Sequence, residues 1–248
     1  HGFSHEYINY MLGGTFRASY TPLNDNIING RIRGVAGVVG CTNPRVKQDW
    51  VHVELVKELI KNDVLVLQTG CSQIALAKAG LTSPEAAVLA GNGLREVCET
   101  VGMPPVLGLG SCVDNTRILT VLTQIVEEGG LGDDIDQVPA VGLAPEWMSE
   151  KAISIGQYFV ASGVYTVFGV TWPTEGSKEV TDYLFKEMEE KFGVSAAAPV
   201  AMMAAGPGDR HGPQAGDIPR REHRDRHVQS AGAAAALHRR AAGARPDR

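Results

Sequence analysis

The chain contains five short runs of consecutive apolar residues, separated by stretches in which apolar positions recur with helical spacing. Apolar runs without polar alternation are typical of strands that are covered on both faces. We expect strands at residues 34–39, 64–68, 105–109, 138–143 and 164–170. We expect helices at residues 51–61, 84–101, 115–128, 147–161 and 178–192. This alternation predicts an α/β fold, a Rossmann-like doubly wound parallel sheet with helices on both faces.

The two ends of the chain differ from this central region. Residues 1–33 carry two short helical patterns and are expected to form a helical lead-in. Residues 34–194 form the predicted Rossmann-like domain. Residues 195–248 are rich in Ala, Gly, Pro and Arg and contain no Lys, Phe, Tyr or Trp, so we predict a disordered, low-complexity basic tail. Nine arginines without one lysine also resemble GC-rich DNA read in a shifted frame, so a frameshift is an alternative origin of this segment.

Charge and hydropathy argue against two classes of protein, nucleic-acid-binding proteins and membrane-spanning proteins. The formal net charge of −5 divides into −9 for residues 1–194 and +4 for residues 195–248, and an acidic body argues against nucleic acid as the main partner. No run approaches the roughly 18 apolar residues of a membrane span. The chain begins with His rather than Met and has no secretion leader, so we expect a cytoplasmic protein that is a fragment of a larger chain.

Three of the four cysteines share one topological position. Cys41, Cys71 and Cys112 each follow a predicted strand, and the carboxyl ends of parallel strands meet at one edge of a sheet, where ligands bind. Each strand-to-helix turn is expected to stabilise the thiolate, which is the ligand of soft metals and iron-sulfur clusters. Core packing is the alternative for any single cysteine, and we expect it for Cys98, which lies within a predicted helix.

Other polar residues have simpler explanations from sequence alone. Lys151, near the start of a predicted helix, is either a surface lysine paired with Glu146 or Glu150 or an acid and anion-stabilising group at the same sheet edge. His52 is expected at the surface or partly buried, and Asp114 or Asn115 is expected as a helix N-cap. A dinucleotide site is not indicated, because the best glycine-rich turn lacks its third glycine.

Four motifs, taken in order, resemble one protein family. They are GVVGCTNPRVKQD around Cys41, LQTGCSQIALAKAGL around Cys71, GSCVDNTRI around Cys112 and PEWMSEKAISIGQYF around Lys151. Together they resemble the carboxyl-terminal half of the nickel-iron carbon monoxide dehydrogenase catalytic subunit. The motif residues are most similar to the form that partners acetyl-CoA synthase in acetogens. The resemblance covers about residues 2–193.

The resemblance implies a reaction and a set of ligands. The family oxidises CO with water to CO2, protons and electrons at a nickel-iron-sulfur centre, the C-cluster. By this resemblance Cys41 and Cys71 bind irons of the cluster, and Cys112 binds the nickel. Lys151 matches the lysine that hydrogen-bonds the bound carboxylate, and Ile155 would be an apolar wall near the nickel. Ferredoxin as electron partner, a homodimer and an acetyl-CoA synthase subunit are the partners implied.

The resemblance also implies that part of the centre lies elsewhere. The family's further 4Fe-4S clusters, a His and two Cys that complete the C-cluster, and a proton-transfer His belong to upstream regions that this sequence does not contain. Two alternatives therefore stay open. The chain is a non-catalytic truncated fragment of that enzyme, or it is a hybrid-cluster relative that resembles hydroxylamine reductases.

Overall fold

The computed structural model describes residues 3–13, 19–169, 176–194 and 196–197. All of them belong to the first of two units, His1–Gly216, and the second unit, Asp217–Arg248, lies outside the described residues. The predicted tail therefore falls outside them as well, except for positions 196 and 197. Within the described ranges, no helix is both long and apolar enough to cross a membrane.

A parallel sheet forms the centre of the fold and confirms the predicted fold class. The strand order is β3-β2-β1-β4-β5-β6, and every neighbouring pair is parallel. The strands are β1 (Gly34–Val38), β2 (Val64–Gln68), β3 (Val106–Gly108), β4 (Ala140–Ala144), β5 (Tyr165–Phe168) and β6 (Ala196–Ala197). The first five match the five apolar runs, and β6 adds a two-residue edge strand just beyond the predicted domain boundary at residue 194.

Helical elements connect the strands. The α-helices are α1 (His5–Gly13), α2 (Thr21–Ile28), α3 (Trp50–Lys61), α4 (Cys71–Lys78), α5 (Asn92–Val101), α6 (Asn115–Glu128), α7 (Glu150–Ala161), α8 (Lys178–Asp182) and α9 (Met188–Phe192). The 3-10 turns are η1 (Pro84–Leu89), η2 (Cys112–Asp114) and η3 (Ile135–Gln137), and a π-helical turn, η5 (Tyr183–Glu187), joins α8 to α9.

Two helical elements differ from the prediction. The helix expected over residues 84–101 is broken at Gly91, where a side chain would collide with the carboxylate of Asp63. That carboxylate accepts the N–H of Leu94 at 2.9 Å and so satisfies the first turn of α5. Helix α4 was absent from the predicted elements, because its eight residues, CSQIALAK, carry no apolar stripe that distinguishes a helix from a loop.

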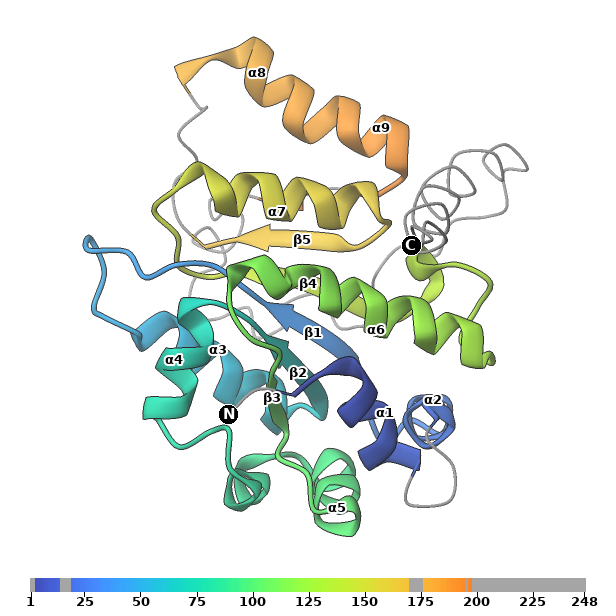
Figure 1. The fold of residues 1–248 in the computed structure, drawn as a ribbon. Coiled ribbons are helices and arrows are strands. Elements are labelled where there is room, and N and C mark those ends of the chain that lie inside the picture. The colour runs from blue at the N-terminus through green and yellow to red at the C-terminus, as the bar shows by residue number, and fades with distance from the viewer. Residues whose placement is uncertain (1–2, 14–18, 170–175, 195, 198–248) are drawn as a thin grey trace, which may run out of the picture. The chain divides into compact units, whose positions relative to one another are not determined.

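Helices cover both faces of the sheet (Figure 1). On one face, α6 and α7 pack against the central strands, and a side chain on Gly37 of β1 would touch Ile118 of α6 and Phe159 of α7. Helix α3 packs against β2 from behind in this view. The predicted lead-in forms α1 and α2, which pack on α6, where the side-chain amide of Asn24 donates to the carbonyl of Ile125 at 2.9 Å.

The strand order indicates where a ligand would bind at the edge of the sheet. The chain winds outward from β1 through β2 to β3, and then returns to β4 on the other side of β1. In open parallel sheets, ligands bind beyond the carboxyl ends of the strands where the winding reverses. Here that switch point lies between the loop after β1 and the loop after β4.

Helix α7 lies tightly against the sheet at Gly156. A Cβ atom at this position would overlap the ring of Phe168 in β5. The Phe168 ring is fully buried and meets Trp147 edge-on, with ring centroids 6.2 Å apart, so it has little room to move. Position 156 therefore sets how closely α7, and the residues at its start, lie against the sheet.

Replacing Gly156 with Ala is expected to destabilise the fold by about 1–3 kcal/mol, although Ala normally favours a helix interior over Gly. Urea unfolding of the chain measures the effect. Ser154→Ala, on the exposed face of the same helix, is the matched control and is expected to change stability by no more than about 0.5 kcal/mol. A Gly156→Ala variant as stable as the native chain would show that α7 does not rest on Phe168.

Candidate metal centre

Three thiols follow the carboxyl ends of three adjacent parallel strands. Cys41 lies three residues after β1, Cys71 is the first residue of α4 after β2, and Cys112 is the first residue of η2 after β3. All three are free thiols; Cys41 and Cys71 are half-buried and Cys112 is exposed. The fourth cysteine, Cys98, lies in α5 and is 1% exposed in the hydrophobic core, as expected from its helical position.

Gly70 brings two of the thiol loops into contact. A Cβ atom on Gly70 would lie 3.0 Å from the Sγ atom of Cys112 and 3.3 Å from the carbonyl oxygen of Gly40. The φ angle of Gly70 is +68°, a conformation that residues with side chains rarely adopt. The N–H of Gly70 also donates to the carbonyl of Gly110 at 2.9 Å. The turn before Cys71 is thus fixed against Cys112 and against the residue before Cys41.

The electrostatics of Cys71 differ from the sequence expectation. Burial raises the pKa of the Cys71 thiol above its ordinary value, and the nearby Cys112 and Cys41 thiols raise it further. A backbone hydrogen bond from Thr42 lowers the pKa but does not reverse the direction. In the metal-free chain, burial and the neighbouring thiols thus disfavour the Cys71 thiolate, against the expectation of a stabilised thiolate at this position.

The positions of the three thiols indicate which kind of metal site they can form. Over the described part of the chain, no group of three or more His, Cys, Asp or Glu side chains is close enough to bind a single metal ion. Thiols that bind different metal atoms of one cluster need not converge on a point, and iron-sulfur clusters are held by thiolates of this kind. The donor set thus fits a cluster rather than a zinc-type site, but three thiols supply fewer than the four ligands that such clusters usually have.

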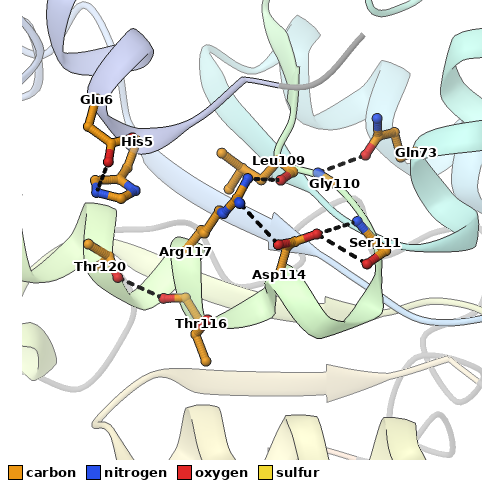
Figure 2. Close-up of polar contacts among 10 residues, drawn as sticks. All are labelled: His5, Glu6, Gln73, Leu109, Gly110, Ser111, Asp114, Thr116, Arg117 and Thr120. Atoms are coloured by element: carbon orange, nitrogen blue, oxygen red, sulfur yellow. Dashed lines mark hydrogen bonds and ion pairs between the residues drawn. The ribbon is translucent and has the colours of Figure 1, made fainter. Parts of the chain in front are cut away.

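A polar network holds the turn that carries Cys112 (Figure 2). The carboxylate of Asp114 accepts the N–H of Ser111 at 2.8 Å and its hydroxyl at 3.1 Å, forming a capping box around η2. Arg117 contacts Asp114 at 3.3 Å and donates to the carbonyl of Leu109 at 3.1 Å. Asp114 is the N-cap residue of α6, as expected, but its side chain makes no capping bond to that helix and instead serves the third position of the capping box around η2.

The Cys112 turn is also tied to α4 and β2. The side-chain oxygen of Gln73, two residues after Cys71, accepts the N–H of Gly110 at 3.0 Å, as Figure 2 shows. The buried side chain of Asn115 binds the hydroxyl of Thr69 and donates to the carbonyl of Cys112. These contacts join the Cys71 and Cys112 loops into one preformed unit.

The Cys41 loop is held by different residues, which sequence reasoning missed. His52 was expected at the surface or partly buried, but it is 0% exposed, and its Nε2 atom lies 2.8 Å from the carbonyl oxygen of Cys41. Burial lowers the pKa of His52, which favours the neutral ring. Glu146 is also 0% exposed. The burial of His52 and Glu146 has no local sequence signal, because it depends on contacts between segments that are far apart in the chain.

Lys151 and Ile155 lie across the switch point from Cys41. Helix α7 begins at Glu150 after the N-cap Ser149, whose hydroxyl accepts the N–H of Lys151 at 3.3 Å. The Lys151 side chain is exposed and forms no ion pair with any described residue, so the expected surface pair with Glu146 or Glu150 is wrong. Ile155, one turn later, is half-buried against the core.

Comparison with known proteins identifies relatives over most of the chain. The chain is 54% identical over 196 residues to carbon monoxide dehydrogenase 1 of Methanosarcina mazei, a match that covers 79% of this chain and 30% of that protein. The chain thus spans less than a third of the length of that relative. Its motifs therefore correspond to one portion of a longer protein.

Two solved structures share the fold. A nickel-free carbon monoxide dehydrogenase from Thermococcus sp. AM4 superposes with a TM-score of 0.74 at 50% identity, covering 82% of this chain and 32% of that one. A structure of acetyl-CoA synthase/carbon monoxide dehydrogenase with NiZn[Fe4S4] and NiNi[Fe4S4] clusters gives a TM-score of 0.72 at 34% identity, covering 82% and 32%. These identities do not single out the acetyl-CoA synthase-associated form.

The family model described as Prismane/CO dehydrogenase matches residues 4–201, which include all four motifs and all six strands. This match and the high identity to carbon monoxide dehydrogenases confirm the family that the motifs predicted. The chain belongs to the Prismane/CO dehydrogenase family.

Proposed function

We propose that the chain is the carboxyl-terminal, cluster-binding portion of an anaerobic carbon monoxide dehydrogenase. The reaction is CO + H2O → CO2 + 2 H+ + 2 e−, in which the carbon gains an oxygen from water and water loses both protons. The observation that carries this proposal is the placement of Cys41, Cys71 and Cys112 at three adjacent strand ends, in a chain of this family.

The three thiolates would hold a nickel-iron-sulfur cluster, with Cys41 and Cys71 on irons and Cys112 on nickel. The free state of the thiols and the glycine turns around them support this assignment. When bound, the cluster supplies a soft metal for CO and accepts the two electrons. The exposure of Cys112 supports its assignment to the metal that meets the substrate, because the other two thiols are half-buried.

Lys151 would contribute a cation at the switch point. Its ammonium has no ion-pair partner among the residues that the structure describes, so it is free to donate to the oxygens of CO2 and to stabilise negative charge that develops on them. Ile155 lies one turn further along α7 and would keep water from the apolar side of the CO site. Both residues come from one rigid helix, whose distance from the sheet is set at Gly156.

The finer parts of the proposal come from the family resemblance. They are ferredoxin as the electron acceptor, a homodimer, an acetyl-CoA synthase partner, a cytoplasmic location and further 4Fe-4S clusters with the missing ligands upstream. The relatives' greater length supports the last of these, because this chain matches only 30% of the Methanosarcina mazei protein.

A second candidate is a non-catalytic fragment of the same enzyme. Three thiols at the sheet edge, one fewer than a four-ligand cluster requires, favour this alternative for the chain by itself. Metal analysis of the anaerobically purified 248-residue chain separates the two. Stoichiometric nickel and iron would exclude the inert fragment, and a metal-free protein would support it.

Cys112→Ala in the complete parent enzyme is expected to remove most of the nickel and with it CO-dependent dye reduction, because the thiolate assigned to nickel is lost. Nickel and iron are measured after anaerobic reconstitution. Cys98→Ala, which removes a buried thiol away from the sheet edge, is the control and should keep its nickel. A Cys112→Ala enzyme with full nickel content would refute the assignment, and a native enzyme that loads nickel but does not oxidise CO would refute the proposed activity.

Lys151→Ala in the same enzyme is expected to keep both metals while turnover falls by about 100-fold or more, because only the charge stabilisation is removed. The matched control is Lys178→Ala, an exposed lysine in the first turn of α8, which should leave turnover unchanged. Loss of metal in Lys151→Ala, or native turnover, would show that the role given to Lys151 is wrong.

A further inference from the structure

The buried carboxylate of Glu146 has no part in the proposed chemistry. It lies in the loop between β4 and α7 and is 0% exposed. One of its oxygens accepts the N–H of Asn43 at 3.3 Å, and the other accepts the N–H of Val51 at 3.2 Å. A buried carboxylate is unfavourable unless hydrogen bonds compensate its lost hydration, and here both donors are backbone N–H groups, one in the loop after β1 and one in the first turn of α3.

The bond to Val51 completes the start of α3. The N-cap residue of this helix, Asp49, has a φ angle of +63° and makes no capping hydrogen bond with its side chain. Glu146 supplies the missing acceptor and places a negative charge at the positive end of the helix dipole. The next residue, His52, binds the carbonyl of Cys41 at 2.8 Å, so the start of α3 is connected directly to the thiol loop.

The chain on each side of Cys41 contacts Glu146 or the residue after it. A Cβ atom on Gly40 would lie 2.5 Å from the carbonyl oxygen of Glu146, so the two backbones are in close contact. On the other side of Cys41, Asn43 donates its side-chain amide to the carbonyl of Trp147 at 2.7 Å. The chain between these contacts carries Cys41, and the chain that follows Trp147 leads to Lys151.

We propose that Glu146 is a positioning residue that fixes the Cys41 loop against the start of α7, and thereby sets Cys41 relative to Lys151 across the switch point. That the distance between Cys41 and Lys151 matters for catalysis rests on the proposed function. The anchoring of the Cys41 loop is independent of it, because it is a property of the metal-free chain.

The test compares Glu146→Gln with Glu150→Gln in the 248-residue chain, without metal and under anaerobic conditions. Both variants remove one negative charge from the same loop and helix start, but Glu150 is exposed. Iodoacetamide labels the free thiols, and peptide mass spectrometry gives a rate for each cysteine.

In Glu146→Gln, Cys41 is expected to be labelled about tenfold faster than in the native chain. The variant loses a charge-assisted hydrogen bond and places an amide N–H against a backbone N–H. Cys112 and Cys98 should keep their native rates, and Glu150→Gln should behave as native throughout.

Two results would overturn the proposal. Native labelling of Cys41 in Glu146→Gln would show that the carboxylate does not anchor the loop. An equal rise at Cys41, Cys112 and the core thiol Cys98 would show that Glu146 stabilises the fold as a whole. If Glu146→Gln does not fold, Glu146→Asp, whose shorter side chain cannot keep both bonds at their length, is expected to raise Cys41 labelling alone, by a smaller factor; no rise there would refute the anchor.

Because the labelling uses metal-free protein, its outcome is independent of whether the complete enzyme oxidises CO. In that enzyme Glu146→Gln should lower the iron content that depends on Cys41, and Glu150→Gln should not. A complete enzyme that binds no metal in any form would instead count against the proposed function and leave the anchoring result standing.

Discussion

The turn before Cys71 lies so close to two neighbouring loops that a side chain at position 70 would crowd both of them. Its missing Cβ leaves space for the Sγ atom of Cys112 on one side and the carbonyl of Gly40 on the other. The parallel register of β1, β2 and β3 brings the three loops to this edge, and the positive φ angle of Gly70 lets them touch. The proposed metal centre depends on this close approach, because without it the three thiols would belong to separate loops.

Close thiols repel one another once they ionise. Burial and the two neighbouring thiols raise the pKa of Cys71, so the metal-free site disfavours the charged state that metal ligands must have. The positive charge of bound metal would offset this repulsion and favour the thiolates. The polar networks around the loops hold the thiols in place. Asp114, Gln73 and Asn115 fix the Cys112 turn, and Glu146 with His52 fixes the Cys41 loop.

The sequence predicted what depends on local pattern. Five apolar runs became five parallel strands, and the cysteines that follow three of them lie at one sheet edge. The break at Gly91 was not predictable, because the carboxylate that accepts the Leu94 N–H at the start of α5 belongs to Asp63, in another segment. The role of Glu146 was missed for the same reason, since its hydrogen-bond partners lie 103 and 95 residues away in the chain. The role of Lys151 came from the family resemblance, because an exposed lysine at a helix start has no distinguishing pattern.

The most direct test of the metal centre is anomalous diffraction at the nickel and iron edges from anaerobic crystals of the complete parent protein. We expect nickel bonded to the Sγ atom of Cys112, and iron bonded to the Sγ atoms of Cys41 and Cys71. Nickel bound elsewhere, or strand-end thiols with no metal beside them in a fully loaded enzyme, would contradict the assignment.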